Sequence, residues 1–390
     1  MTAPRWASRV VDALSSFGLA CLLLIFLALL TWLGTLEQVD KGLYDVQRRY
    51  FESLYVVHHA GPVPIPLPGG LLVMGLLAVN LVLGGMVRLR KGAATAGVFV
   101  THVGILMLLV AGYVKSYHSE DGHTTLYEGQ SSNVFKSYHR WELAILQPQE
   151  DGRLRETVAP EEDFLGSRGA APAKLASAEL PFDVELRNFT PNADVLPKGP
   201  MVRTAMPVIE GYFIAPLPPE KDNERNVAAV CATVIDKSSG ARQESILYGL
   251  SREPWTVSVG GHDYGLELRR QQYQMPFTVE LDDFRKEDHP RLDMAKSFES
   301  DVTVIQAGSR RPVRISMNEP LRQDGLVLYQ ASWGPANARP GDPLFSTLAV
   351  ARNPADHYPL YACIVIAAGL VLHFSRKLVR HIRSQSQALA

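Results

Sequence analysis

The sequence predicts an integral membrane protein with four transmembrane helices and a large extracytoplasmic domain of mainly antiparallel β-strands. Three observations support this fold class: four long apolar runs, basic residues gathered on one side of those runs, and strand-like alternation between the third and fourth run. The strand pattern does not distinguish a sandwich-like domain from an open barrel.

The four apolar runs contain no Asp, Glu, Lys or Arg and cover residues 17–35, 67–87, 93–114 and 358–374. A helix needs about 20 residues, with a lower limit of roughly 17, to cross about 30 Å of hydrocarbon. Residues 1–115 are therefore expected to hold three transmembrane helices, and residues 358–390 a fourth helix with a basic tail. No small-residue cleavage site follows the first run, so a removable signal peptide is not expected.

The orientation follows from the basic residues beside the runs. They form three clusters: Arg5 and Arg9; Arg88, Arg90 and Lys91; and Arg376, Lys377, Arg380 and Arg383. All three clusters fall on one side, which the positive-inside rule makes cytoplasmic. Both termini are then cytoplasmic, and residues 116–357 lie on the outer side of the inner (cytoplasmic) membrane.

Charge and cysteine content exclude some classes of function. With 39 Lys and Arg against 40 Asp and Glu, the chain has no basic excess of the kind that nucleic acids attract. Cys21 and Cys363 lie in apolar runs, which leaves Cys231 alone in the outer domain. A disulfide within that domain is thus impossible, and the absence of a Cys-x-x-Cys motif argues against thiol exchange.

Hairpin patterns in the outer domain predict β structure. Residues 226–249, 256–268 and 302–317 each contain two apolar or β-branched runs around a turn that includes glycine. Two stretches, 147–177 and 197–226, are rich in Pro, Gly and charge and are expected to be loops.

His102 is the first candidate for chemistry, because it is the one charged or imidazole side chain in its apolar run. A polar ring in hydrocarbon costs free energy unless a partner, a cavity or a metal satisfies it. Two interpretations stay open: a packing histidine bonded to a carbonyl or to Thr101, or a metal ligand. The residues alone favour the packing role.

Other candidates have simpler explanations. Trp32 lies at the end of the first run, where an aromatic belt explains it better than stacking on the ring of a cofactor does. His58 and His59 are expected to be an exposed loop pair, with an approach to a cofactor as the alternative. His118 and His123 are expected to be solvated.

Three segments resemble the ResB (CcsB) family of cytochrome c biogenesis proteins. They are WLGTLEQ at 32–38, THVGI at 101–105, and above all SMNEPLRQDGLVLYQ at 316–330, which residues 348–354 and the fourth run follow. The resemblance covers both ends of the chain, whereas residues 147–253 match nothing in the family.

The resemblance implies a membrane subunit that helps to hold reduced haem b and to present it to exported apocytochrome c. It implies a polytopic partner of the ResC or CcsA type in the bilayer, and a haem iron shared between a histidine of that partner and His102. Since no nucleophile with a base, nucleotide loop or carboxylate constellation is visible, the chain is expected to be a non-catalytic subunit of the haem-attachment complex.

Two alternatives remain. Asn318, Glu319 and Pro320 form a polar turn that serves either as a structural corner or as a docking point for apocytochrome or the partner protein. The whole chain could instead be a membrane-anchored sensor or scaffold that binds no haem. Haem that copurifies with the complex would distinguish these classes.

Overall fold

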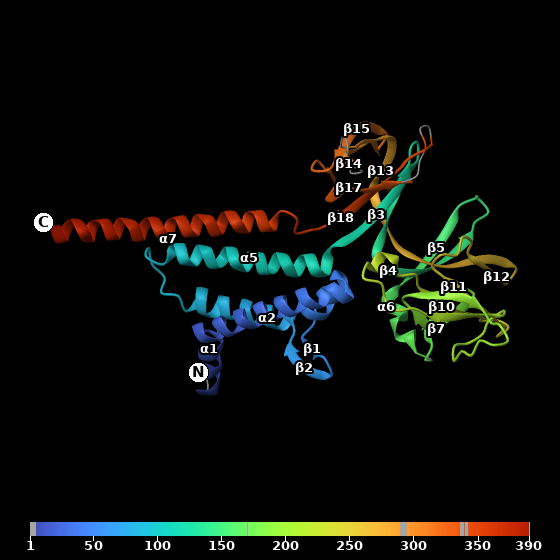
Figure 1. The fold of residues 1–390 in the computed structure, drawn as a ribbon, viewed down its shortest axis with the longest axis horizontal. Coiled ribbons are helices and arrows are strands. Elements are labelled where there is room, and N and C mark those ends of the chain that lie inside the picture. Colours follow the sequence, from blue (N-terminus) through green and yellow to red (C-terminus); the bar gives the residue numbers. More distant parts are fainter. Residues whose placement is uncertain (1–4, 170, 289–294, 336–338, 340–341, 390) are drawn as a thin grey trace. The chain divides into compact units, whose positions relative to one another are not determined.

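The computed structural model describes residues 5–169, 171–288, 295–335, 339 and 342–389 (Figure 1). The chain divides into two compact units, Met1–Ser119 with Asn353–Ala390, and Glu120–Arg352. The first unit is helical and the second is built of β-strands. Each unit is described separately below.

The helical unit contains one long helix after another, interrupted by a short hairpin. Its elements are α1 (Arg5–Leu14), α2 (Phe17–Lys41), α3 (Leu43–Val46), the π-helical η1 (Gln47–Phe51), β1 (Tyr55–Ala60), β2 (Val63–Pro68), α4 (Gly70–Asn80), the π-helical η2 (Leu81–Val87), α5 (Ala96–His118) and α7 (Tyr358–Leu389).

Four helical segments of the described chain are long and apolar enough to span a membrane: Phe17–Lys41, Gly70–Val87, Ala96–His118 and Tyr358–Gln387. The predicted fold class is therefore confirmed. The helices differ from the apolar runs at their ends, since α2 continues to Lys41 and α7 continues through the basic residues to Leu389.

Close helix contacts depend on small or polar residues. Figure 1 shows α5 and α7 side by side, and a Cβ built on Gly97 would lie 2.6 Å from the backbone nitrogen of His373. Asn80, which is buried in α4, donates to the carbonyl oxygens of Leu14 at 2.7 Å and Ser16 at 2.9 Å. These carbonyls lie at the junction of α1 and α2, so the amide joins α4 to that junction.

The β unit contains strands β3 to β18 and three short helices. Its elements are β3 (Glu120–Tyr127), β4 (Ser131–Pro148), β5 (Leu154–Pro160), α6 (Glu161–Phe164), η3 (Leu165–Arg168), β6 (Ala173–Leu175), β7 (Phe182–Thr190), β8 (Ala193–Pro197), β9 (Tyr212–Pro216), η4 (Asn223–Arg225), β10 (Ala229–Asp236), β11 (Arg242–Tyr248), β12 (Trp255–Val259), β13 (His262–Asp288), β14 (Ala295–Gln306), β15 (Ser309–Ser316), β16 (Leu321–Gln323), β17 (Leu326–Gly334) and β18 (Phe345–Arg352).

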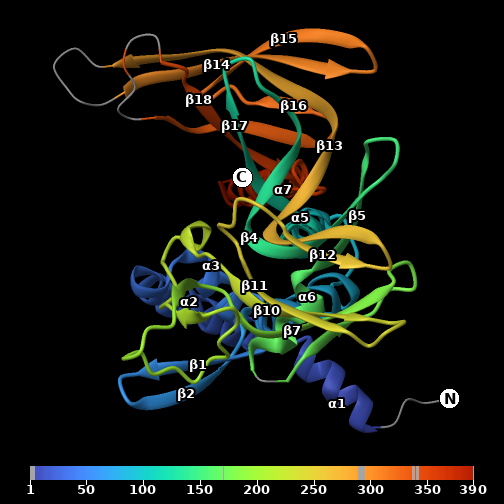
Figure 2. The same cartoon turned by 90° about the vertical axis from the view of Figure 1, so that its right-hand side faces the viewer.

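The main sheet has the order β15-β14-β13-β4-β3-β18-β17-β16, with β12 on β13 and β5 on β4, and these strand pairs are antiparallel. Its two ends approach each other, because Arg311 of β15 donates to Gln323 of β16 at 2.9 Å. The result is a nearly closed, barrel-like sheet, whose long strand β13 can be followed in Figure 2.

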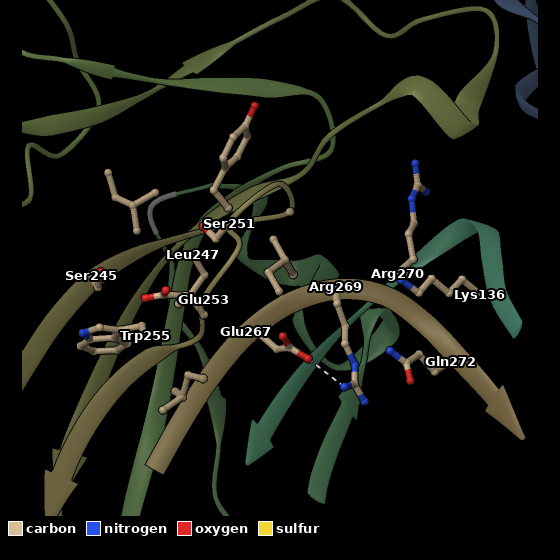
Figure 3. Close-up of a pocket in the computed structure, with 15 residues that line it drawn as sticks. Lys136, Ser245, Leu247, Ser251, Glu253, Trp255, Glu267, Arg269, Arg270 and Gln272 are labelled. Carbon is tan, nitrogen blue, oxygen red and sulfur yellow. Dashed lines mark hydrogen bonds and ion pairs between the residues drawn. The ribbon is translucent and has the colours of Figure 1, made fainter. Parts of the chain in front are cut away.

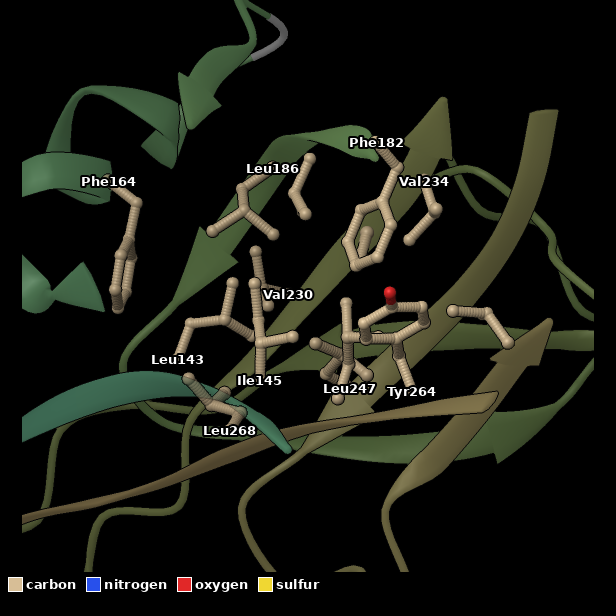
Figure 4. Close-up of a cluster of buried hydrophobic side chains, with 14 of the residues drawn as sticks. Leu143, Ile145, Phe164, Phe182, Leu186, Val230, Val234, Leu247, Tyr264 and Leu268 are labelled. Atoms are coloured by element: carbon tan, nitrogen blue, oxygen red, sulfur yellow. The ribbon is translucent and has the colours of Figure 1, made fainter. Parts of the chain in front are cut away.

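Two large cores lie in the described part of this unit, beside a smaller cluster that includes Ile214 and Cys231. Inside the barrel-like part, apolar residues of β13, β14, β17 and β18 meet, among them Val279, Val302, Leu328 and Leu348. The other core lies between a second sheet, β11-β10-β7-β6, and the strands β4, β12 and β13. Figure 4 shows Phe182 and Val230 of the second sheet facing Tyr264 of β13 across this core. The unit thus contains both a sandwich-like and a barrel-like part.

The three predicted hairpins are confirmed as β10–β11, β12–β13 and β14–β15. The loop predictions are partly wrong. Within 147–177 the strand β5 pairs with β4, and within 197–226 the strand β9 pairs with β8. Both strands are short and carry proline or charge, and these features hide a strand in a composition-based reading.

Candidate functional site

His102 lies on α5, six residues after the helix begins at Ala96. At 1.5 Å per residue, this position is about 9 Å from that end of the helix. His102 therefore lies in the half of α5 that follows the basic loop with Arg88, Arg90 and Lys91. The side chain is half-buried within the helical unit.

The His102 ring has a defined tautomer. Its Nδ1 lies 2.7 Å from the carbonyl oxygen of Val98, one turn earlier. Because a carbonyl can only accept, Nδ1 carries the proton, and Nε2 is left with a lone pair that can bind a metal. Thr101 is not the partner, since its hydroxyl donates to the Gly97 carbonyl at 3.0 Å.

Gly85 of η2 lies against the side of the ring that carries this lone pair. A Cβ built on Gly85 would be 2.9 Å from Nε2 of His102 and closer still to Cδ2. Only a residue without a side chain leaves the ring in place here. The contact occurs in a π-helical segment, a feature that is frequent at functional sites. This contact cannot be seen in the sequence, because a glycine in an apolar run looks like ordinary packing.

The WLGTLEQ motif ends α2, and its members have different surroundings. Trp32 is 61% exposed within the protein, as the aromatic-belt interpretation requires. Gly34 is buried and faces Val46, with a Cβ at position 34 lying 3.4 Å from Val46 Cγ1. Glu37 accepts hydrogen bonds from Arg49 at 2.6 Å and from Tyr50. Sequence reasoning missed the contacts of Glu37 and Tyr50, although Glu37 lies within the WLGTLEQ motif.

His58 and His59 do not form a loop pair, so that prediction is wrong. Both belong to strand β1 of the β1–β2 hairpin, where neighbouring side chains point to opposite faces. His58 is half-buried with Nδ1 2.6 Å from the Tyr50 hydroxyl, whereas His59 is exposed.

The signature segment 316–330 contains the expected polar turn. The backbone N–H of Ser316 donates to the Glu319 carbonyl at 3.2 Å, and the reverse bond has the same length. Asn318 and Glu319 are exposed and Pro320 is half-buried, just before β16. The turn connects β15 to β16; the structural-corner role and docking at these three residues both stay predictions.

A cavity of about 440 Å³ lies in the β unit, beside β11 and β13 (Figure 3). Arg269 of its lining is already paired: it donates to Glu142 at 2.8 Å, Glu156 at 2.9 Å and Glu267 at 2.7 Å. An arginine that holds three carboxylates has little capacity left for an anionic ligand. The cavity is therefore a weaker candidate for the functional site than His102 is.

His118, His123 and the lone thiol of the β unit have ordinary settings. His118 is exposed. His123 is half-buried rather than solvated and stacks on Tyr138, and its pKa is lowered by burial and by the nearby Lys136 and Arg270. Burial, with a contribution from Glu244, raises the pKa of Cys231 to about 11. The thiol stays protonated at neutral pH, which argues against thiolate chemistry.

Among the described residues, no group of three or more His, Cys, Asp or Glu side chains is arranged to hold a metal ion. His102 could therefore bind a metal only if other ligands came from outside this chain. A porphyrin supplies four such ligands within its own ring, and only axial positions are left for the protein.

The fold and this site define a class: a membrane protein in which four apolar helices accompany a β unit, and one helix carries an imidazole whose Nδ1 bonds to a backbone carbonyl. Comparison with known proteins is consistent with this class. A family model described as the ResB-like family matches residues 255–342, which run from β12 to the last part of the β unit.

Two curated relatives, both named cytochrome c biogenesis protein CcsB, come from Prochlorococcus marinus. The protein of strain NATL1A is 39% identical and that of strain NATL2A is 38% identical over 69 residues, which are 17% of this chain and 16% of each relative. The match thus spans about a sixth of the relatives' length. Together with the family model, it shows that part of this chain is similar to ResB/CcsB proteins.

Proposed function

We propose that this chain is the ResB/CcsB-type subunit of a membrane complex that matures cytochrome c. In this proposal His102 gives one axial ligand to haem b, which the complex carries across the inner membrane to exported apocytochrome c. A ResC/CcsA-type partner in the bilayer provides the second ligand. The observation that carries the proposal is the orientation of His102, with Nδ1–H bonded to Val98 and Nε2 free to donate to iron.

The surroundings of His102 favour haem over a bare ion. A bare ion would need three or more ligands from the protein, and the described residues contain no such group. Arg90 and Lys91 are exposed in the loop just before α5, at the same end of the helix as His102. Because haem has two carboxylate side chains, basic residues at this end would attract them.

The chemistry of haem attachment explains why such a ligand is useful. Thioether bonds form between the haem vinyl groups and two reduced cysteines of apocytochrome, so the haem must be held reduced and in a fixed orientation until the substrate arrives. Axial imidazoles tune the potential of the iron and hold it in place. The proposed role of this chain is to bind and position haem within the complex, without a catalytic site of its own.

A substitution series at His102 tests the proposal. Asn at position 102 can still donate to the Val98 carbonyl but has no good lone pair for iron. His102→Asn and His102→Ala are expected to lose most of the haem that copurifies with the complex and most cytochrome c maturation, with normal insertion of the chain. Added imidazole should restore part of the haem signal in His102→Ala. His118→Ala, which changes an exposed histidine of the same helix, is the control.

Full haem content and full maturation in His102→Asn would show that the ring only packs. A wild-type complex that is well folded but colourless would instead favour the membrane-anchored sensor or scaffold, in which the β unit binds a protein or a ligand.

A further inference from the structure

A second imidazole of the helical unit, His58, belongs to a chain of buried polar groups. The Tyr50 side chain is fully buried, and its hydroxyl contacts both the Glu37 carboxylate and Nδ1 of His58, the latter at 2.6 Å. Glu37 also accepts from Arg49 at 2.6 Å and from Lys41. Two cations thus stabilise the carboxylate, which acts here only as an acceptor.

The positions of the protons in this chain follow from that carboxylate. The Tyr50 hydroxyl donates to the Glu37 carboxylate. Its single proton goes to Glu37. The phenol oxygen must therefore accept from His58, which places the second proton on Nδ1 and leaves Nε2 with a lone pair. Hydrogen-bonded groups behind the ring, arranged in this way, orient metal-binding histidines.

The surface beside His58 is apolar and open. In the β1–β2 hairpin His58 lies directly opposite Ile65, and Ala60 lies opposite Val63, so these four residues share one face. Ile65 is 39% exposed and Val63 is 56% exposed. The face thus combines one oriented imidazole with an accessible aliphatic surface, which suits the flat apolar body of a porphyrin. His59 points to the other face, opposite Pro64.

His58 and His102 lie at opposite ends of the α4–η2 segment. A Cβ on Gly70, where α4 begins, would be 2.8 Å from Cα of Phe51, which adjoins Tyr50. His102 contacts Gly85, fifteen residues later in the same segment. At 1.5 Å per residue, the separation is about 22 Å along the axis. The two imidazoles cannot bind one iron from opposite sides. Haem bound by His58 would therefore occupy a second position.

We propose that Nε2 of His58 is an axial ligand for iron protoporphyrin at a second position, on the apolar face of the β1–β2 hairpin. The inference rests on the proposed function, because haem must be available to the complex. It adds a site at the end of the helical unit away from His102, where haem would be held after leaving the first position. Tyr50 and Glu37 are positioning residues for this ligand.

The test uses the full-length chain, purified in detergent and titrated with iron protoporphyrin IX under reducing conditions. All variants are made in the His102→Asn background, which removes the first site. In this background we expect one remaining haem with an imidazole-type Soret band. His58→Asn should weaken this binding about tenfold or more, because Asn can still donate to Tyr50 but offers no lone pair to iron. His59→Asn, its neighbour on the other face, should bind as the background does.

Tyr50→Phe tests the orienting chain without removing the imidazole. It should weaken haem binding about tenfold, which is typical when a group that hydrogen-bonds to a metal-ligating histidine is removed, and it should shift the Soret band. This variant also covers the case in which His58→Asn fails to fold. Equal affinity and spectrum in the His58→Asn, His59→Asn and background proteins would overturn the inference.

The two proposals fail in different ways. If haem binding depends on His102 alone, the second site is wrong and the first stands. If it depends on His58 alone, the role of His102 is wrong and the second site stands. A chain and complex that bind no haem in any form would overturn both.

Discussion

His102 and Gly85 form a contact that leaves no room for a further methyl group. The ring lies where the Gly85 side chain would be, with Nε2 2.9 Å from the position of a Cβ. A glycine in a helix interior costs about 0.5–1 kcal/mol relative to alanine. Its presence here is therefore explained by the space that the imidazole occupies.

We predict that Gly85→Ala displaces the His102 ring and lowers the haem that copurifies with the complex. Forcing a methyl group into this contact should cost about 1–3 kcal/mol or push the ring away from its Val98 bond. Gly75→Ala is the matched control, since a Cβ on this α4 glycine meets nothing within 4 Å. Haem absorbance per mole of protein is the measurement. Equal haem in Gly85→Ala and Gly75→Ala would contradict this prediction and would show that the His102 ring can shift without loss of haem.

At the residue scale the sequence predicted some of the site. His102 stood out because one ionisable ring in an apolar run is visible in the sequence. Gly85 and Tyr50 did not, because their importance depends on contacts between elements that the sequence does not reveal. Glu37 lay inside a family motif, which was the one signal that could have pointed to it.

At the element scale, the second apolar run shows how a correct pattern can conceal two structures. Residues 67–87 were predicted as one helix, but α4 begins at Gly70 and becomes π-helical at Leu81. The helix does not begin earlier because prolines at 64, 66 and 68 lack the N–H that a helix interior needs. These prolines lie in strand β2, which ends at Pro68. Alternate prolines are compatible with an edge strand, since every second N–H there points away from its neighbour.

Arg269 and Glu142 join two neighbouring strands, β13 and β4, through a buried ion pair. The Glu142 side chain is 3% exposed and that of Arg269 is 16% exposed. Burial raises the pKa of Glu142, although Arg269 opposes the shift. Arg269 thus stabilises the buried Glu142 carboxylate, whose charge would cost free energy if it were unpaired.

We predict that Arg269→Ala lowers the free energy of unfolding of the β unit by about 3–5 kcal/mol at pH 7.5, because it leaves an unpaired buried charge. Denaturant unfolding followed by the fluorescence of the buried Trp141 measures this. Arg155→Ala is the control; its pair with Glu179 is 53% and 63% exposed and should matter by about 0–1 kcal/mol.

The deficit in Arg269→Ala should shrink as the pH falls. Removing the arginine raises the folded-state pKa of Glu142 further above its unfolded value, so the folded state binds the proton more tightly. The contribution of protonated Glu142 to stability is then fully present below its unfolded-state pKa. It is lost as the pH rises through its folded-state pKa. A deficit that is equal at pH 7.5 and pH 5 would contradict this account.

At the scale of the whole molecule, the sequence predicted the class of fold and left its finer form open. Four apolar runs and the strand alternation were sufficient for four helices and a β unit. The choice between sandwich and barrel could not be made, because it depends on which strands pair across long separations, such as β18 with β3. The unit contains one core of each kind.

The orientation of the helices remains a prediction, and both haem proposals depend on it. Reporters at Gly92 and after Ala390 are expected to show cytoplasmic signals, because they adjoin the basic clusters. Insertions in the β10–β11 turn at Ser239 and in the β1–β2 turn at Gly61 are expected to show outer signals. Both turns are exposed, and a Cβ on Gly61 meets nothing within 4 Å, so a small reporter should be tolerated. A phosphatase that is active only outside the cytoplasm and a fluorescent protein that folds only inside give complementary readings. A cytoplasmic signal at Ser239 would reverse the arrangement, and a cytoplasmic signal at Gly61 alone would place His58 on the side where haem enters.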